Sequence, residues 1–159
     1  MTFFEKQTDP TAPMHWLGDM QADYLYPSGV AGDKFFKHIM KNNTFLADSC
    51  PKCNKTYCPP RLYCEDCFCE IPDKEWFDVP AKGEIKLHTI ATINTYGNKL
   101  EAPTLIGMIK IDKTDGLFLG IIKTENPEEI FQGVQVEAVF KPKNQREGTL
   151  KDILYFKIK

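Results

Sequence analysis

The sequence of 159 residues lacks an excess of charge of either sign, a long apolar run and a secretory leader. Its 20 Lys and Arg nearly balance its 22 Asp and Glu, whereas a protein that binds nucleic acid by charge normally has a basic excess. No stretch approaches the roughly 18 consecutive apolar residues of a membrane span, and no basic-then-apolar leader opens the chain. We therefore expect a cytoplasmic protein without a membrane segment.

Recognisable catalytic motifs are missing as well. The three histidines are scattered, and there is no nucleophile elbow, no Walker loop and no H-E-x-x-H zinc motif. With 42% apolar and 26% charged residues, the composition is that of ordinary globular domains, and the length suffices for one domain or two small ones. The sequence does not support a stand-alone enzyme.

Cysteine, by contrast, is abundant, and four of the six cysteines form two Cys-x-x-Cys pairs: Cys50 with Cys53, and Cys64 with Cys67. In a chain without a leader, this pattern favours metal binding over a disulfide framework. Structural Zn²⁺ prefers four thiolates at about 2.3 Å, and such a site leaves no position for a catalytic water. We predict a zinc ribbon, with a redox dithiol pair, an iron site or a catalytic zinc as alternatives.

Two cysteines remain outside these pairs. Cys69 could replace Cys67 as a ligand, although its spacing from Cys64 makes a poorer knuckle. Buried free thiols are the simplest interpretation of Cys58 and Cys69. A disulfide between them is a second hypothesis, because each follows one of the pairs.

Between the cysteine pairs lies Arg61, directly after two prolines. Prolines fix the backbone in an extended conformation, so Arg61 is expected to project from a stiff loop. It is a candidate ligand for a phosphate or carboxylate group. The alternative is a local salt bridge to Glu65 or Asp66.

Apolar residues at helical spacing predict two helices before the cysteines. The first covers residues 10–26, and the second opens at residues 32–33, with Asp33 as its N-cap, and ends at residues 42–43. Neither helix is long enough to be stable alone. Their aromatic residues therefore either pack on the body of the protein or dock a partner; the candidates are Trp16, Tyr24, Phe35 and Phe36.

Alternating apolar residues predict strands in the second half of the chain. We expect five, at residues 83–95, 104–111, 116–123, 134–141 and 153–158, with a short helix at 126–131 between the third and the fourth. This order favours an OB-fold barrel over a generic five-stranded sandwich. The predicted organisation is mostly β: an N-terminal helical segment (1–46), a rubredoxin-like zinc ribbon (47–74) and a five-stranded OB-fold domain (75–159).

An OB-fold barrel can bind nucleic acid, but that use needs a basic groove and exposed aromatic residues. Residues 75–159 contain 12 Lys and Arg and 12 Asp and Glu, so the barrel carries no net charge. Basic residues gather near the C-terminus, and Lys141, Lys143 and Arg146 are candidates for binding a phosphorylated small ligand. The alternative is that they are solvated loop residues.

Taken together, these features resemble one known family. They are an aromatic helical segment, Cys50-Pro51-Lys52-Cys53, Cys58-Pro59-Pro60-Arg61, Cys64-Glu65-Asp66-Cys67 and then a five-stranded barrel. The chain resembles the zinc-ribbon plus OB-fold acyl-CoA-associated family, a domain family of unknown function, over roughly residues 14–158. Cys69 departs from the usual pattern of that family.

The resemblance implies a non-catalytic partner of thiolase-fold enzymes. Members of the family accompany acetoacetyl-CoA thiolase, 3-hydroxy-3-methylglutaryl-CoA synthase or lipid-transfer-type thiolases and aldolases, bridge their subunits and help to hold the CoA part of acyl-CoA. It follows that the ribbon and helices dock on the enzyme while the barrel faces the nucleotide end of CoA. The alternative from a different class is a nucleic-acid-binding zinc-ribbon and OB-fold module.

Overall fold

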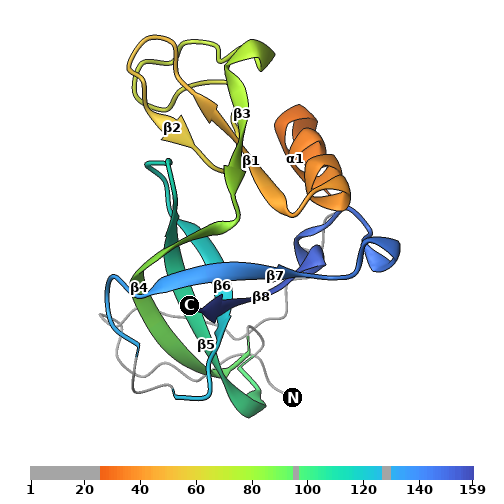
Figure 1. Ribbon diagram of the computed structural model, residues 1–159, viewed down its shortest axis with the longest axis vertical. Helices are drawn as coiled ribbons and strands as arrows, with labels where there is room; N and C mark the ends of the chain where they lie inside the picture. Colours follow the sequence, from red (N-terminus) through yellow and green to blue (C-terminus); the bar gives the residue numbers. More distant parts are fainter. Residues whose placement is uncertain (1–25, 95–96, 127–129) are drawn as a thin grey trace, which may run out of the picture.

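The computed structural model describes residues 26–94, 97–126 and 130–159. A small three-stranded sheet with a helix beside it stands on a closed five-stranded barrel (Figure 1). The described part of the chain is thus mostly β, with an OB-like barrel, as the sequence predicts. The expected first helix, over residues 10–26, lies almost entirely outside the described residues.

Helix α1 spans Gly29–Lys41 and buries Phe35 and Ile39, which lie one turn apart on the face toward the core. It begins earlier than predicted, so Ser28 rather than Asp33 stands at the N-cap position. Asp33 lies inside the helix, where its carboxylate accepts a hydrogen bond of 2.6 Å from Lys37 Nζ. The C-terminal end, after Lys41, is where the sequence predicts it.

The small sheet consists of β1 (Thr44–Ser49), β2 (Thr56–Tyr57) and β3 (Trp76–Pro80), in the order β2-β1-β3. It extends beyond the expected ribbon at residues 47–74, because Thr44 pairs with Pro80 at its far end. The cysteine loops are too short to form a sheet of their own, so the strands on either side of them provide it. A 3₁₀ turn, η1 (Asp73–Glu75), leads into β3.

The five barrel strands predicted from alternation are all present. They are β4 (Lys82–Ile93), β5 (Lys99–Ile111), β6 (Phe118–Lys123), β7 (Gln135–Phe140) and β8 (Ile153–Ile158). The 3₁₀ turns η3 (Lys143–Gln145) and η4 (Leu150–Asp152) lie between β7 and β8. The middle of the short helix predicted at residues 126–131, residues 127–129, lies outside the described part.

Strand β4 closes the barrel because it pairs with strands on both of its sides. Its whole length is antiparallel to β5, and its first three residues, Lys82 to Glu84, also pair with β7. The circuit is completed by a short parallel contact between β6 and β8, with Ile122 opposite Phe156. A long first strand shared by both halves of the sheet is what the sequence predicts for an OB fold.

One hydrophobic core joins the helix, the small sheet and the barrel. Phe45 of β1 stacks on Phe118 of β6 with ring centroids 5.2 Å apart, and Phe35 of α1 lies 6.0 Å from Phe45. Phe156 of β8 packs 6.1 Å from Phe118. Because one aromatic cluster takes residues from all three parts, these parts hold a fixed relative position.

A polar contact adds a second connection between the sheet and the barrel. Asp115, in the loop between β5 and β6, accepts hydrogen bonds from the backbone N–H (2.9 Å) and the hydroxyl (2.8 Å) of Thr56 in β2. Figure 1 shows this loop reaching from the barrel toward β2. None of the described helices has the length and apolar character that crossing a membrane requires.

Candidate metal centre

The two cysteine pairs form knuckles with the same backbone geometry. The N–H of Asn54 donates to the carbonyl oxygen of Cys50 (2.8 Å), and the N–H of Phe68 donates to that of Cys64 (3.1 Å). Both donors have left-handed backbones, with φ of 60° and 54°. Each knuckle is therefore a tight turn that directs two sulfur atoms to one side.

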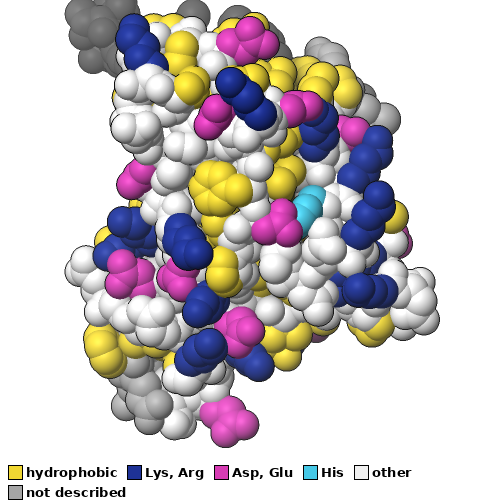
Figure 2. Space-filling view, turned by 45° about the horizontal axis from the view of Figure 1, so that its top comes forward, with side chains coloured by type: hydrophobic (Ala, Val, Ile, Leu, Met, Phe, Trp, Pro, Cys, Tyr) yellow, Lys and Arg dark blue, Asp and Glu magenta, His cyan; other side chains and the backbone are white. Residues whose placement is uncertain are grey.

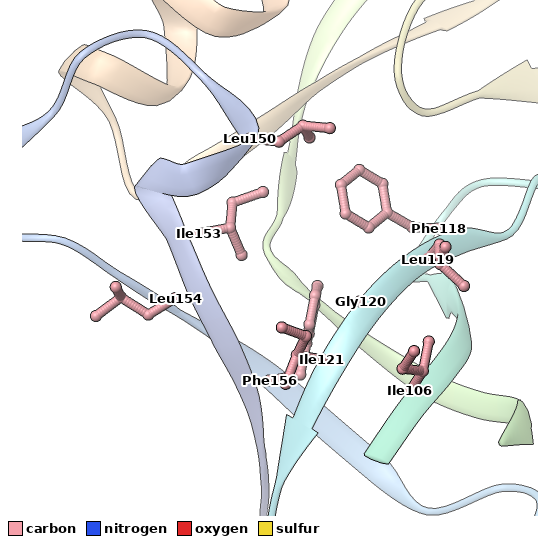
Figure 3. A pocket seen from close by; sticks show the side chains of 9 residues that line it. All are labelled: Ile106, Phe118, Leu119, Gly120, Ile121, Leu150, Ile153, Leu154 and Phe156. Carbon is pink, nitrogen blue, oxygen red and sulfur yellow. The ribbon is translucent and has the colours of Figure 1, made fainter. Parts of the chain in front are cut away.

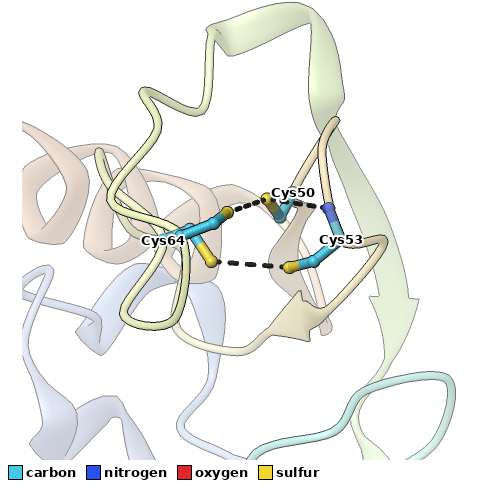
Figure 4. A group of neighbouring side chains, drawn as sticks. Cys50, Cys53 and Cys64 are labelled. Carbon is cyan, nitrogen blue, oxygen red and sulfur yellow. Dashed lines mark hydrogen bonds between the residues drawn. The ribbon is translucent and has the colours of Figure 1, made fainter.

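These turns bring the four predicted ligands together. The sulfur atoms of Cys50, Cys53, Cys64 and Cys67 all lie within 4.8 Å of one another. Cys50 and Cys67 are 3.4 Å apart and Cys53 and Cys64 are 3.5 Å apart, and Figure 4 shows Cys53 facing Cys64 across the two knuckles. Four metal–sulfur bonds of 2.3 Å in a tetrahedron require sulfur separations of about 3.8 Å. The group could hold a metal ion.

The surroundings of the cluster stabilise thiolate forms at two of its positions. Burial raises the pKa of Cys50, but backbone N–H groups of Cys53 and Lys52 outweigh it, and the pKa falls to about 6. The pKa of Cys64 is lowered chiefly by the hydrogen bond with the Tyr57 hydroxyl, at 3.3 Å. Metals bind the thiolate, so these donors favour metal binding.

Cys69 lies against the four-cysteine group as a fifth sulfur. Its sulfur atom is 3.3 Å from that of Cys50 and 3.4 Å from that of Cys67. Cys58 is buried in the main core and belongs to a different cluster of side chains from Cys69. Both are free thiols, so the hypothesis of a Cys58–Cys69 disulfide is wrong. Each cysteine packs in its own cluster instead.

The ribbon has little apolar packing of its own. The buried cluster that belongs to the ribbon alone consists of two of the cysteines together with Tyr57 and Ile71. So small a core cannot by itself offset the conformational entropy of ordering two loops. A bound metal would supply that free energy, as in other small metal-dependent folds.

Arg61 takes part in local interactions on the ribbon. Its guanidinium group lies 2.5 Å from Glu65 Oε2 and stacks over the Tyr57 ring at 4.5 Å. Its backbone N–H donates to the buried carboxylate of Asp48. This salt bridge to Glu65 is the interpretation that the sequence offers as the alternative to binding a phosphate or carboxylate ligand.

The basic candidates near the C-terminus are placed differently from one another. Arg146 donates to the carbonyl oxygens of Ile39 (2.7 Å), Asn42 (2.9 Å) and Lys141 (2.8 Å), so its guanidinium holds the end of α1. Lys141 Nζ lies 3.9 Å from the buried carboxylate of Asp152. Lys143 is exposed in η3. The side chains of Arg146 and Lys141 thus contact protein groups, while that of Lys143 faces solvent.

The aromatic candidates for docking a partner also differ in their placement. Phe35 is 1% exposed in the main core, and Phe36 packs against that core while remaining partly accessible. Phe35 therefore has the packing role that the sequence offers as the alternative to docking. Trp16 and Tyr24 lie outside the described residues.

An aliphatic surface on the barrel was not predicted from the sequence. Leu87 of β4, Met108 of β5 and Leu119 of β6 are paired across adjacent strands, and both leucines are 64% exposed. Ile106 and Ile121 form the next such pair. We call Leu87, Ile106, Met108, Leu119 and Ile121 the aliphatic face. The signal was present, because β5 and β6 carry apolar residues at consecutive positions.

Two apolar hollows flank this face. One, of about 230 Å³, lies between β6 and β8, where Leu150, Ile153 and Leu154 stand across from Leu119 and Ile121 (Figure 3). The other, of about 130 Å³, lies between Leu87 and Leu119. The barrel thus presents a continuous aliphatic surface to solvent, larger than scattered exposed residues would produce.

Charge is mixed over most of the face seen in Figure 2, where Lys and Arg side chains lie among Asp and Glu, but basic side chains follow one another down its right-hand edge. Two basic side chains of the ribbon are neutralised locally, since Lys55 pairs with Glu65 and Asp66 and Arg61 pairs with Glu65. Over the rest of this face the charges are balanced, whereas a nucleic-acid interface has a basic excess.

No family model matches the sequence, but individual proteins do. A "DUF35 domain-containing scaffold protein" of Methanocaldococcus jannaschii is 26% identical over 106 residues, which are 67% of this chain and 74% of that protein. A crystal structure of a DUF35-family protein of unknown function from Sulfolobus solfataricus has a TM-score of 0.58 and 23% identity, over 82% of this chain and 84% of that one. A structure named "Ltp2-ChsH2(DUF35) aldolase" has a TM-score of 0.54 and 14% identity, over 79% and 91%. The two structures share the fold of this chain.

Proposed function

We propose that this homologue of a DUF35-family scaffold protein is a non-catalytic scaffold subunit of the cytoplasm. In that role it binds thiolase-fold enzymes of lipid or isoprenoid-precursor metabolism and helps to hold acyl-CoA. The M. jannaschii relative is named a scaffold protein, and one structure of the same fold is named an aldolase that contains a DUF35 component, ChsH2, with Ltp2. These names support an accessory role beside an enzyme.

The aliphatic face of the barrel is the observation that carries the proposal. In OB folds the outer surface of the second and third strands is the usual binding surface, which here corresponds to β5 and β6. Nucleic-acid binders cover it with aromatic and basic side chains, whereas this chain has Ile106, Leu119 and Ile121 there. Such a surface suits an apolar protein partner and argues against the nucleic-acid alternative.

The cysteine cluster fits a structural role in such a scaffold. Zinc would be held by Cys50, Cys53, Cys64 and Cys67, and four thiolates leave no position for a reacting water. The metal would stabilise the knuckles, and the shared aromatic core would fix the ribbon on the barrel. A bridging subunit needs its binding surfaces at fixed positions, and a ribbon fixed on the barrel would meet that need.

A polar hollow offers a place for the nucleotide part of CoA. It measures about 340 Å³ and lies where β1 and β3 meet the barrel strands β7 and β8, with Lys82, Arg146 and Lys157 among its lining residues. Arg146 is held by backbone carbonyls, and Lys82 lies 3.7 Å from Asp112. Lys157 is therefore the residue we expect to contact phosphate groups directly.

Two measurements test the proposal. The tagged protein is purified from its source cells, its stoichiometric partner is identified by mass spectrometry, and the pair is reconstituted from pure components. We expect a thiolase-fold enzyme, and we expect acetyl-CoA to raise the melting temperature of the protein or of the complex. Binding of single-stranded DNA or RNA that falls steeply with salt, with no effect of CoA, would overturn it in favour of a nucleic-acid module.

A further inference from the structure

The second knuckle has an unusual residue at its tightest point. The residue after the second cysteine of each knuckle must have positive φ, and this residue is Asn54 in the first knuckle and Phe68 in the second. Among the described residues, three non-glycines have positive φ, namely Asn54, Phe68 and Lys113, and Phe68 is the aromatic one. Glycine and asparagine adopt this backbone readily, whereas for a bulky side chain it is an outlier.

Packing does not explain the phenylalanine. The Phe68 side chain is 81% exposed, so it contributes little to the ribbon core. An exposed phenyl ring also carries the unfavourable hydration of apolar surface. The fold would be served better by asparagine, which the first knuckle has at the same place. A strained and exposed aromatic residue of this kind indicates a function outside the fold.

The same knuckle exposes further apolar surface and carries acidic charge. Tyr63 is 60% exposed and Leu62 is 37% exposed, just before Cys64. Residues 62–70 contain three acidic residues, Glu65, Asp66 and Glu70, and no Lys or Arg, and two of these acids are paired with Lys55 and Arg61. The knuckle therefore lacks the basic excess that attracts phosphate backbones and anionic lipid surfaces, so base stacking and membrane insertion are disfavoured. An aromatic residue with these neighbours suits a protein surface.

We propose that Phe68 is a docking anchor that inserts into an apolar socket on the enzyme partner. This inference rests on the proposed scaffold function and adds a contact separate from the aliphatic face. Figure 1 shows the β1–β3 sheet, from which the knuckles extend, at the end of the molecule opposite the lower end of the barrel. The N–H of Phe68 donates to the carbonyl oxygen of Cys64, so the backbone that carries the ring is fixed before binding, which lowers the entropic cost of docking.

The test uses the reconstituted complex with the enzyme that the wild-type protein binds. Phe68→Asn gives the second knuckle the residue of the first, and it should keep the metal content and equal or exceed the wild-type melting temperature. The dissociation constant, measured by titration calorimetry, should rise about 30-fold or more, as for an aromatic hot spot. Asn54→Gly relaxes the other knuckle without removing an aromatic ring, and Phe131→Ala removes an exposed phenylalanine of the barrel; both should bind within twofold of wild type.

The outcomes separate the two proposals. If Phe68→Asn binds the enzyme within twofold of wild type, the docking role is wrong and the scaffold function stands. If the stoichiometric partner is another class of protein and Phe68→Asn still loses it, the docking role stands and the thiolase assignment fails. If wild type has no protein partner, both proposals are overturned. Sedimentation would show whether the wild-type protein self-associates. If it does, and Phe68→Asn abolishes this self-association, the partner of Phe68 is a second copy of this chain and not an enzyme.

Discussion

The guanidinium group of Arg146 donates a hydrogen bond of 2.7 Å to the carbonyl oxygen of Ile39, which lies 107 positions earlier in the chain. Carbonyl groups in the last turn of a helix have no partner within it. Arg146 satisfies two of these, on Ile39 and Asn42, from the loop between β7 and β8. In Figure 1 this loop lies against the lower end of α1. The residue is thus a connection between helix and barrel.

Replacing Arg146 should therefore lower stability. We expect Arg146→Met to reduce the free energy of unfolding by about 2–3 kcal/mol, because hydrogen bonds from a charged group are lost and helix carbonyls are left unpaired. Arg146→Lys should retain only part of the stability that Arg146→Met loses, since an ammonium group cannot donate in the planar pattern of a guanidinium. Urea denaturation measures both. Wild-type stability with weakened acyl-CoA binding would instead identify Arg146 as a ligand residue.

The cysteine cluster gives the second prediction. Cys50→Ser, and likewise a serine at any of the other three predicted ligand positions, should abolish stoichiometric metal binding and unfold the knuckles. Phe45 and Val79 are anchored in the main core, so the barrel with β1 and β3 should stay folded. Metal analysis and hydrogen exchange measure this: amides of residues 50–71 should lose protection while those of the barrel keep it.

Cys69→Ser is the matched control for these variants. Its sulfur lies against Cys50 and Cys67 but is outside the group of four. We expect this variant to bind metal with the same stoichiometry and to keep its knuckles protected. If instead Cys67→Ser retains metal and Cys69→Ser loses it, the fourth ligand is Cys69.

How far the sequence could predict this structure depends on the range of the interactions involved. Cys50 and Cys53 meet within one turn, so their spacing alone indicates a shared ligand set, and the alternation in β4 is equally local. The start of α1 was predicted too late because Asp33 has the chemistry of an N-cap. The structure instead uses it in a pair with Lys37.

Long-range contacts explain what the sequence could not reveal. Nothing near Arg146 in the sequence indicates that α1 ends beside it, so a basic residue in a loop suggested a ligand site. The place of Cys69 beside the cluster, by contrast, follows from local spacing, because Cys69 is two residues from the predicted ligand Cys67. The aliphatic face could have been suspected from β6, where apolar residues on both sides break the strict alternation of a half-buried strand.

Gly83 lies where β4 pairs with both of its neighbouring strands, so a substitution there tests the closure of the barrel. It pairs with Ile111 of β5 on one side and Val136 of β7 on the other. A Cβ atom there would lie 2.1 Å from the carbonyl oxygen of Lys110, and backbone cannot move away as a side chain can. We expect Gly83→Ala to destabilise the protein by about 2–4 kcal/mol in urea denaturation. Gly116→Ala, which meets nothing within 4 Å, should be nearly neutral.

The aliphatic face predicts a binding defect without a folding defect. Leu119→Lys places a charge at its centre on a side chain that is already 64% exposed, so the free energy of unfolding should change by less than about 0.5 kcal/mol. Affinity for the enzyme partner should fall about tenfold or more, measured by titration calorimetry. Leu117→Lys is the control, because Leu117 is 41% exposed but lines neither apolar hollow. Equal loss of affinity in both variants would contradict a specific face.

Asp152 predicts a pH-dependent contribution to stability. Its buried carboxylate accepts hydrogen bonds from the N–H groups of Gly148 (2.7 Å), Glu147 (3.0 Å) and Thr149 (3.2 Å), and so shapes the loop that carries Arg146. Burial raises the pKa of Asp152, but these N–H groups outweigh it and hold the pKa below the ordinary value of 3.8.

Because the pKa of Asp152 is lowered on folding, the stability it contributes is complete above pH 3.8 and is lost as the pH falls through the folded value. Asp152→Asn should cost about 1.5–3 kcal/mol at pH 7, since an amide oxygen accepts these N–H groups more weakly than a carboxylate. The gap between variant and wild type should narrow as the pH falls below 3.8, where the wild-type side chain also becomes neutral. Urea denaturation of both proteins from pH 7 to pH 2.5 measures this difference, in which acid effects common to the two proteins cancel. A gap that stays constant across that range would mean that the charge of Asp152 does not hold the loop.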